Sequence, residues 1–146
     1  MSAASTIVLG FDGSPGAEAA LRFAAEEATL RGLPLRIVCA WEAAPTAYVG
    51  EVFAPTPDAF LEGQRRAEEV VRAGVELAAG LGVEAEGVAI EGNPAAKLIE
   101  QARDAALLVV GSRGHGTAAS LLLGSVSQRL AHHAPCPLAI VPSREG

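Results

Sequence analysis

Residues 106–125 read ALLVVGSRGHGTAASLLLGS, an apolar run that passes directly into a segment rich in glycine and hydroxyl side chains. The apolar part, Ala106–Gly111, predicts a strand that is buried on both faces, as in a parallel sheet covered by helices. Residues 111–125 then hold four glycines, three serines, one threonine and one arginine. The chain therefore leaves a buried strand through a loop with many unobstructed backbone amides.

The rest of the chain repeats this alternation of apolar runs and helical patterns. The predicted strands span residues 6–11, 35–41, 83–90, 106–111 and 137–142, and the predicted helices span residues 15–31, 58–81, 94–105 and 126–133. Each connection is long enough for a right-handed crossover, so the pattern predicts an α/β fold with one doubly wound parallel sheet and helices on both faces. The length of 146 residues fits a single domain, residues 1–146. We expect the fully apolar strands 6–11 and 106–111 at its centre.

Two helix starts follow the same pattern of a capping residue and a proline. Ser14 precedes Pro15, and Asn93 precedes Pro94, which is the order expected of an N-cap and a first helical residue. Gly32 is placed to end the first helix. Residues 42–57 form a connection longer than most in such folds, and around it lie Trp41, Tyr48 and Phe53, half of the six aromatic side chains. Two interpretations stay open for this segment: a lid that responds to a ligand, or a surface loop with aromatic side chains beneath it.

Charge and composition exclude several classes of function. The formal net charge is −6, which argues against nucleic acid or an acidic membrane as the main partner. Residues 111–146 nevertheless carry three arginines against one glutamate, a local surplus that suits a small anion. No apolar run approaches the ~18 residues of a membrane span, and the first ten residues lack the basic segment of a signal peptide. With Cys39 and Cys136 expected as free thiols in apolar runs, these features predict a cytoplasmic protein.

The glycine-rich loop is a candidate anion site because the carboxyl ends of parallel strands carry the ligand sites of doubly wound sheets. Gly111, Gly114 and Gly116 would let the backbone adopt positive φ and approach a ligand closely. Ser125 and Gln128 match the S-x-x-Q capping box, which predicts that the last helix starts at Ser125. A helix N-terminus favours phosphate, and Arg113 would add a charged fork. The alternative is a flexible connection followed by an ordinary helix cap.

Other nucleotide and metal motifs match less well. A P-loop needs G-x4-G-K-[ST], whereas the single lysine, Lys97, lies on the third predicted helix. The spacing in residues 10–16 is G-x2-G-x2-G with a proline in the turn, which departs from a dinucleotide fingerprint. His132 and His133 are adjacent and would point to different faces of a helix, so with Cys136 they do not form a metal site. His115 either touches phosphate or is solvated.

The spacing G-x2-G-x9-G-S, formed by Gly111, Gly114, Gly124 and Ser125, resembles the ATP-binding signature of the universal stress protein family. The stretches IVLGFDGSPGAEAALRFA, ALLVVGSRGHG and LLLGSVSQRLAHHAPCPLAIVP also look like that family, so the resemblance covers essentially the whole chain. It implies the adenine nucleotide α hydrolase-like version of the fold, with strand order 3-2-1-4-5. Where family members often read DAD before the fourth strand, this chain reads DAA at residues 104–106, a position that precedes the site.

The resemblance also implies roles for individual residues. Asp12 would face the ribose or a phosphate-bound Mg²⁺. The backbone near the base would come from Gly10 and Phe11, and the adenine pocket from Ala40, Val110 and Gly111. The triphosphate would be held by Arg113, Gly114, His115, Gly124, Ser125 and Val126.

The function implied is that of an ATP-binding regulatory module, with a homodimer formed through the strand Pro137–Pro142 and an unidentified protein partner. Residues 111–125 hold no carboxylate, and Asp12 is the one acidic residue expected to reach the phosphates, so we expect slow or no hydrolysis. Two alternatives stay open: a slow ATPase, or an interaction module whose dimer surface carries the function without nucleotide. An enzyme of the related nucleotide-activating group would need reactive residues that the sequence does not show.

Overall fold

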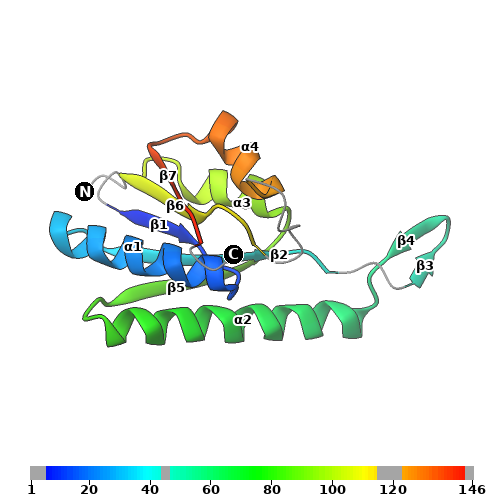
Figure 1. The fold of residues 1–146 in the computed structure, drawn as a ribbon. Helices are drawn as coiled ribbons and strands as arrows, with labels where there is room; N and C mark the ends of the chain where they lie inside the picture. Colours follow the sequence, from blue (N-terminus) through cyan, green and yellow to red (C-terminus); the bar gives the residue numbers. More distant parts are fainter. Residues whose placement is uncertain (1–5, 44–46, 115–122, 144–146) are drawn as a thin grey trace.

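A parallel five-stranded sheet forms the centre of the molecule (Figure 1) in a computed structural model that describes residues 6–43, 47–114 and 123–143. The strands lie in the order β5-β2-β1-β6-β7. Their bounds are β1 Ile7–Gly10, β2 Leu35–Trp41, β5 Ala85–Glu91, β6 Leu107–Gly111 and β7 Leu138–Val141. Counted along the chain among these five, the order is 3-2-1-4-5, as predicted. The apolar strand β1 lies at the centre with β6 beside it.

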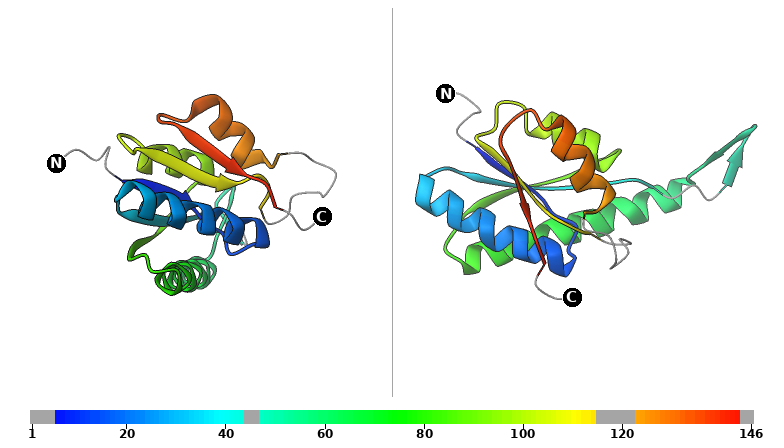
Figure 2. Two further views of the ribbon diagram at one scale, coloured as in Figure 1. Left: turned by 60° about the vertical axis from the view of Figure 1, so that its left-hand side comes forward. Right: turned by 45° about the horizontal axis from the view of Figure 1, so that its top comes forward.

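Two helices cover each face of the sheet (Figures 1 and 2). The helices α1 (Pro15–Arg31) and α2 (Pro57–Gly80) lie side by side on one face. The other face carries α3 (Pro94–Gln101) and α4 (Ser125–His133), which also contact each other. This arrangement confirms the predicted doubly wound architecture, in which all crossovers place helices over a buried parallel sheet.

Three helices begin with a side-chain cap followed by proline. The Ser14 hydroxyl accepts the N–H of Ala17 at 3.2 Å, and Asn93 accepts an equivalent bond at the start of α3 at 3.0 Å. Thr56 caps α2 in the same way at 3.1 Å. At its other end α1 stops at Gly32, whose φ of +66° is the left-handed conformation that glycine adopts without strain. Local sequence therefore fixes where most of the helices begin.

The sheet separates two apolar clusters because successive side chains of β1 point to opposite faces. Ile7 and Leu9 lie in the cluster beneath α1 and α2, whereas Val8 lies in the cluster beneath α3 and α4. All three are fully buried. The sheet-facing side of α1 is made largely of small residues: Ala17, Ala20, Ala24, Ala25 and Ala28. Small side chains bring the helix close to the sheet, so the ends of β1 and β6 are held firmly where the loops begin.

Residues 42–57 contain an antiparallel hairpin that the sequence interpretation missed. β3 (Ala47–Val49) pairs with β4 (Val52–Ala54), and Gly50, with φ +65°, occupies the first position of the two-residue turn. Figures 1 and 2 show the hairpin projecting from the body of the molecule beyond the start of α2. The pattern AYVGEVFA, two short β-prone runs around a glycine, is the signal that would have predicted it.

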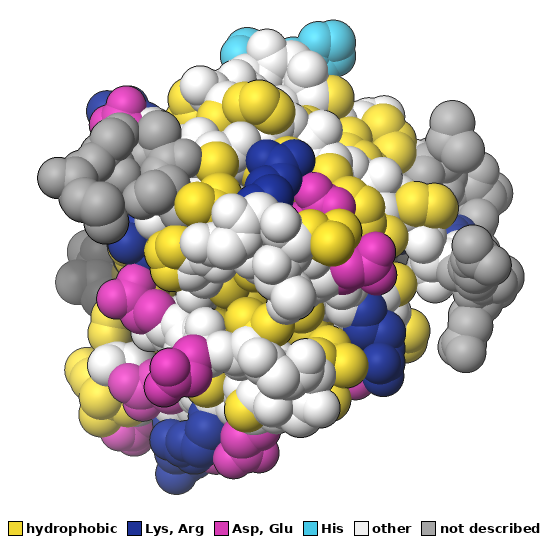
Figure 3. Space-filling view, turned by 90° about the vertical axis from the view of Figure 1, so that its left-hand side faces the viewer, with side chains coloured by type: hydrophobic (Ala, Val, Ile, Leu, Met, Phe, Trp, Pro, Cys, Tyr) yellow, Lys and Arg dark blue, Asp and Glu magenta, His cyan; other side chains and the backbone are white. Residues whose placement is uncertain are grey.

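The face at the amino ends of the strands carries charges of both signs (Figure 3). Basic and acidic side chains lie among hydrophobic ones there, and the basic side chains are separated from one another. Near these amino ends Arg36 and Glu86, each the second residue of its strand, form an ion pair at 2.6 Å across β2 and β5. Within the described ranges, no helix is long and apolar enough to span a membrane.

Candidate functional site

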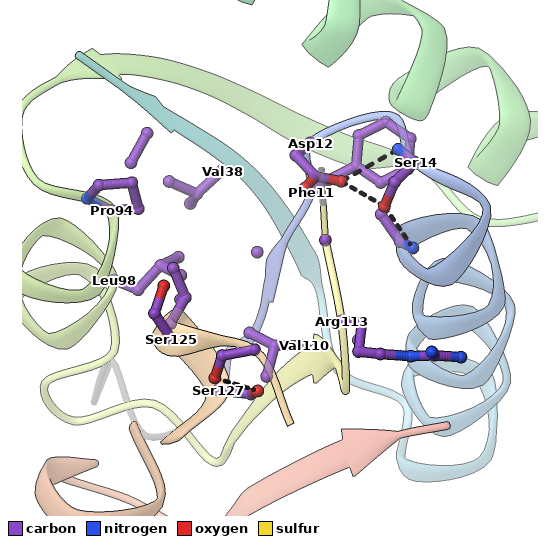
Figure 4. A pocket seen from close by; sticks show the side chains of 17 residues that line it. Phe11, Asp12, Ser14, Val38, Pro94, Leu98, Val110, Arg113, Ser125 and Ser127 are labelled. Carbon is purple, nitrogen blue, oxygen red and sulfur yellow. Dashed lines mark hydrogen bonds between the residues drawn. The ribbon is translucent and has the colours of Figure 1, made fainter. Parts of the chain in front are cut away.

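A pocket of about 220 Å³ opens at the carboxyl ends of β1, β2 and β6 (Figure 4). This is the edge at which the chain order of the strands reverses, between β1 and β6. The structure brings together eleven of the twelve residues that the sequence singled out, and His115 lies outside the described residues. The eleven that line the pocket are Gly10, Phe11, Asp12, Ala40, Val110, Gly111, Arg113, Gly114, Gly124, Ser125 and Val126.

One wall of the pocket is apolar. Val38 and Ala40 come from β2, Val110 from β6, and Pro94 and Leu98 from the first turns of α3. Figure 4 shows Val38, Pro94 and Leu98 grouped on the same side of the pocket. A wall of aliphatic side chains without a charged group suits a flat apolar ring.

Asp12, the second residue after β1, stands across the pocket from this wall (Figure 4). Its Oδ1 accepts hydrogen bonds from the backbone N–H of Ser14 at 3.0 Å and from the Ser14 hydroxyl at 2.6 Å. Because the same hydroxyl oxygen accepts the N–H of Ala17, the carboxylate is connected through Ser14 to the first turn of α1. Oδ2 faces Gly114, where an added Cβ would lie 2.5 Å from it.

The N-terminus of α4 forms a third side of the pocket. Gly124 is its N-cap, and within the described part of the chain no side chain caps this helix. The first helical bond runs from the N–H of Gln128 to the carbonyl of Gly124 at 2.9 Å, so the amides of Ser125, Val126 and Ser127 have no helical acceptor. Unpaired amides at the positive end of a helix dipole form an anion site.

The start of α4 at Ser125 is as predicted, but the capping box is wrong. Ser125 is the first helical residue rather than the N-cap, and its side chain is exposed. Gly124 adopts the extended conformation of the cap with φ −78° and ψ 171°. The reason is that the N–H of Gly124 donates to the carbonyl of Ser112 at 2.7 Å, which brings the chain back to the end of β6 one residue earlier.

The glycines serve a different purpose from the predicted one. Neither Gly111 nor Gly114 has positive φ, and Gly116 lies outside the described residues. A Cβ on Gly111 would lie 2.9 Å from the carbonyl oxygen of Gly16, and a Cβ on Gly16 would lie 2.7 Å from the carbonyl oxygen of Arg113. The missing side chains therefore allow the end of β6 and the start of α1 to approach each other, which brings Asp12 near the loop.

Arg113 lines the pocket and is half-buried. Figure 4 shows its side chain extending away from Ser125 and from the apolar wall. In this conformation the guanidinium does not stand over the N-terminus of α4, so the predicted charged fork on a phosphate requires a different rotamer of Arg113.

The sequence profile of the universal stress protein family matches residues 4–142. The chain belongs to the universal stress protein family. It is 39% identical over 140 residues to a universal stress protein of Thermus aquaticus, with 93% of this chain and 97% of that protein covered. It also matches universal stress proteins of Mycobacterium tuberculosis, of whose length it spans about half.

Two solved universal stress protein structures hold adenine nucleotides. One, a complex with cAMP, is 29% identical with a TM-score of 0.68, and the match covers 93% of this chain and 94% of that one. The other, from Archaeoglobus fulgidus in complex with dAMP, is 26% identical with a TM-score of 0.65, over 94% and 95% of the two chains. Structural relatives of this universal stress protein therefore bind adenine nucleotides.

Six residues that line the pocket of this universal stress protein were not singled out from the sequence: Ser14, Ala17, Val38, Pro94, Leu98 and Ser127. Ser14 and Pro94 were assigned to helix starts. In a parallel sheet, the helix that follows a strand starts at the same edge at which that strand ends. This rule would have added both residues to the site. For Ser127 the sequence holds no comparable signal, because its role depends on a contact with Ser112 fifteen residues away.

Neither Cys39 nor Cys136 lines the pocket. Burial, and to a smaller extent the nearby Asp12 carboxylate, raises the pKa of the Cys39 thiol to about 11, so Cys39 is neutral at pH 7. Cys39 and Cys136 are both free thiols. No group of three or more His, Cys, Asp or Glu side chains suited to a metal ion occurs in the ranges that the structure describes.

Proposed function

We propose that this universal stress protein binds ATP with Mg²⁺ in the pocket and acts as a nucleotide-responsive regulatory module of the stress response. One observation carries the proposal: an apolar wall and the uncapped N-terminus of α4 face the same small pocket at the switch point of the sheet. The adenine ring would lie against Ala40 and Val110, and the phosphates would lie at the amides of Ser125 and Val126. Relatives that hold cAMP and dAMP support an adenine nucleotide as the ligand.

Asp12 suits a magnesium ion that arrives with the nucleotide. It is the one acidic side chain among the described residues that line the pocket. In proteins Mg²⁺ is usually held by one or two carboxylates together with phosphate oxygens and water. Asp12, oriented by Ser14, would therefore supply the protein ligand and ATP the phosphate oxygens.

The same count of carboxylates argues for binding with slow or no hydrolysis. Phosphoryl transfer needs an in-line arrangement, charge neutralisation and a group that orients the attacking water. Asp12 is bonded to Ser14 and is already assigned to the metal, so the described lining offers no second carboxylate to orient the water. A single-turnover rate above about 1 s⁻¹ would contradict this assignment and favour the ATPase alternative.

The proposal is tested by titrating MgATP into the wild type and two Ser125 variants, with heat of binding as the measurement. Ser125→Asp adds a negative charge at the first residue of α4, which stabilises the helix but repels phosphate, so ATP affinity should fall about tenfold or more. Ser125→Asn, of the same size but neutral, is the matched control and should bind within about threefold of the wild type.

The two variants separate a binding effect from a folding effect, because the aspartate is expected to raise the unfolding temperature while it lowers affinity. Equal affinities of Ser125→Asp and Ser125→Asn would show that the phosphates do not lie at α4. An absence of heat with the wild type would contradict nucleotide binding itself and would leave the interaction-module alternative.

We also propose a cytoplasmic location and a homodimer that forms through β7. Two free thiols suit a reducing compartment. β7 is one of the two outer strands of the main sheet, and an exposed edge invites pairing with another chain.

A further inference from the structure

The buried hydroxyl of Ser127 joins the two ends of the glycine-rich loop. Ser127 is 3% exposed, and its Oγ lies 2.8 Å from the carbonyl oxygen of Ser112 and 3.0 Å from that of Gly124. Ser112 directly follows β6, and Gly124 caps α4. Of these two bonds Figure 4 draws the one between Ser127 and Gly124, because Ser112 does not line the pocket. The Ser127 hydroxyl therefore contacts the carbonyl that follows β6 and the carbonyl that precedes α4.

The carbonyl of Ser112 is the point at which these contacts meet. It accepts the N–H of Gly124 at 2.7 Å as well as the Ser127 hydroxyl. The N–H of Ser112 donates to the carbonyl of Val141 in β7 at 2.8 Å. Hydrogen bonds thus connect the start of α4 to the end of β6 and, through Ser112, to β7.

This anchoring matters because the N-cap of α4 is a glycine. Gly124 has no side chain that could accept a hydrogen bond from the first amides of the helix. α1 and α3, by contrast, are fixed at their starts by Ser14 and Asn93. From the third helical position Ser127 instead donates to the carbonyl of the cap residue Gly124, and the amides of Ser125 and Val126 are left without a helical acceptor.

We propose that Ser127 is a positioning residue for the phosphate groups of the bound nucleotide: it holds the amides of α4 at a fixed distance from the apolar wall. This inference rests on the proposed function. Ser127 should affect binding of the phosphates and not binding of the base, because the apolar wall proposed to hold the base comes from β2, β6 and α3. The ratio of the affinities for ATP and adenosine is therefore the quantity that Ser127 controls.

The test compares Ser127→Ala with Ser112→Ala by titrating each with ATP and with adenosine. Ser112→Ala is the matched control because it removes a buried hydroxyl nearby while keeping the backbone carbonyl that accepts both bonds. In Ser127→Ala the affinity for ATP should fall about fivefold, the effect of one lost hydrogen bond, while the affinity for adenosine stays within about twofold. In Ser112→Ala both affinities should stay near those of the wild type.

A second measurement needs no ligand. Hydrogen exchange at the Gly124 amide, which donates to Ser112, should be about fivefold faster in Ser127→Ala than in the wild type, whereas the Gly32 amide at the end of α1 should not change. An unchanged Gly124 amide would show that Ser127 does not anchor α4 and would overturn the inference.

The outcomes separate the two claims. If the wild type binds ATP but Ser127→Ala keeps the wild-type ratio of ATP to adenosine affinity, the assignment of Ser127 is wrong and the proposed function stands. If both affinities fall equally, Ser127 serves the fold alone, and the inference is overturned as well. If the wild type binds no nucleotide, the proposed function fails and the positioning role fails with it.

Discussion

Gly111 lies where the end of β6 meets the first turn of α1, and its missing Cβ is what allows that contact. The carbonyl of Gly16 would lie 2.9 Å from a Cβ at this position, and that carbonyl belongs to the backbone of a buried helix start, which cannot easily move. Glycines in a phosphate loop are usually interpreted through the ligand. Here the constraint at Gly111 comes from the protein's own backbone.

A glycine-to-alanine pair tests this constraint. Gly111→Ala should lower the free energy of unfolding by about 1–3 kcal/mol, because the new methyl group forces two backbone segments apart. Gly80→Ala, at the end of α2 with open space around it, is the control and should leave stability unchanged or raise it by about 0.5–1 kcal/mol. Urea unfolding of both variants measures the difference. Equal unfolding free energies of the two variants would show that the backbone around Gly111 accommodates a methyl group without loss of stability.

The buried Cys39 thiol makes the stability of the fold depend on pH. Its pKa is raised to about 11 in the folded chain from 9.0, first by burial and then by Asp12. The folded chain holds this proton more tightly than the unfolded chain, so the stabilisation is complete below pH 9 and is lost as the pH rises toward 11. Cys39→Ala removes the titrating group. Between pH 9 and 11 the variant should therefore lose less unfolding free energy than the wild type, and the difference between the two losses should be on the order of 2 kcal/mol.

Urea unfolding between pH 8 and 11 measures this difference for the wild type and Cys39→Ala. Cys136→Ala is the comparison at a less buried thiol: partial burial raises the pKa of Cys136 and a backbone hydrogen bond at Leu108 opposes that rise, so a smaller change with pH is expected. A stability difference between wild type and Cys39→Ala that does not change with pH would contradict the assignment.

At the scale of single elements, local signals predicted most of the fold. Capping residues followed by proline gave the starts of α1 and α3, and the apolar runs gave all five strands of the main sheet. The sequence did not predict the N-cap of α4, because the S-x-x-Q pattern at Ser125 competes with a backbone bond between Gly124 and Ser112 that only the folded chain creates. The hairpin at residues 47–54 was missed because its strands have three residues each and pair only with each other.

The site was predictable to the extent that it lies on strand ends. Asp12, Ala40 and Val110 each end or follow a strand, and parallel strands bring such residues to one edge. Leu98 enters from a helix whose orientation follows from packing, which sequence periodicity does not specify. The direction of the Arg113 side chain likewise depends on its neighbours in the folded chain rather than on its place in a motif.

The open edge of the sheet along β7 predicts that the whole molecule forms a dimer. The N–H of Leu108 donates to the carbonyl of Pro137, and that of Ser112 donates to Val141, so the alternate residues Leu138 and Ile140 turn their backbone groups to the outer edge. Two copies paired antiparallel along β7 would continue the sheet across the interface. Sedimentation at micromolar concentration should show a dimer, and a monomer would contradict this.

We propose that ATP binds between the apolar wall and the N-terminus of α4, and an amide chemical shift map of the chain with and without MgATP tests this binding site. We expect saturating MgATP to shift the amide signals of Ser125, Val126 and Ser127 together with those of Ala40 and Val110, while the signals of α2 near Gly80 stay unchanged. Shifts confined to other surfaces, or no shifts at saturating MgATP, would contradict it.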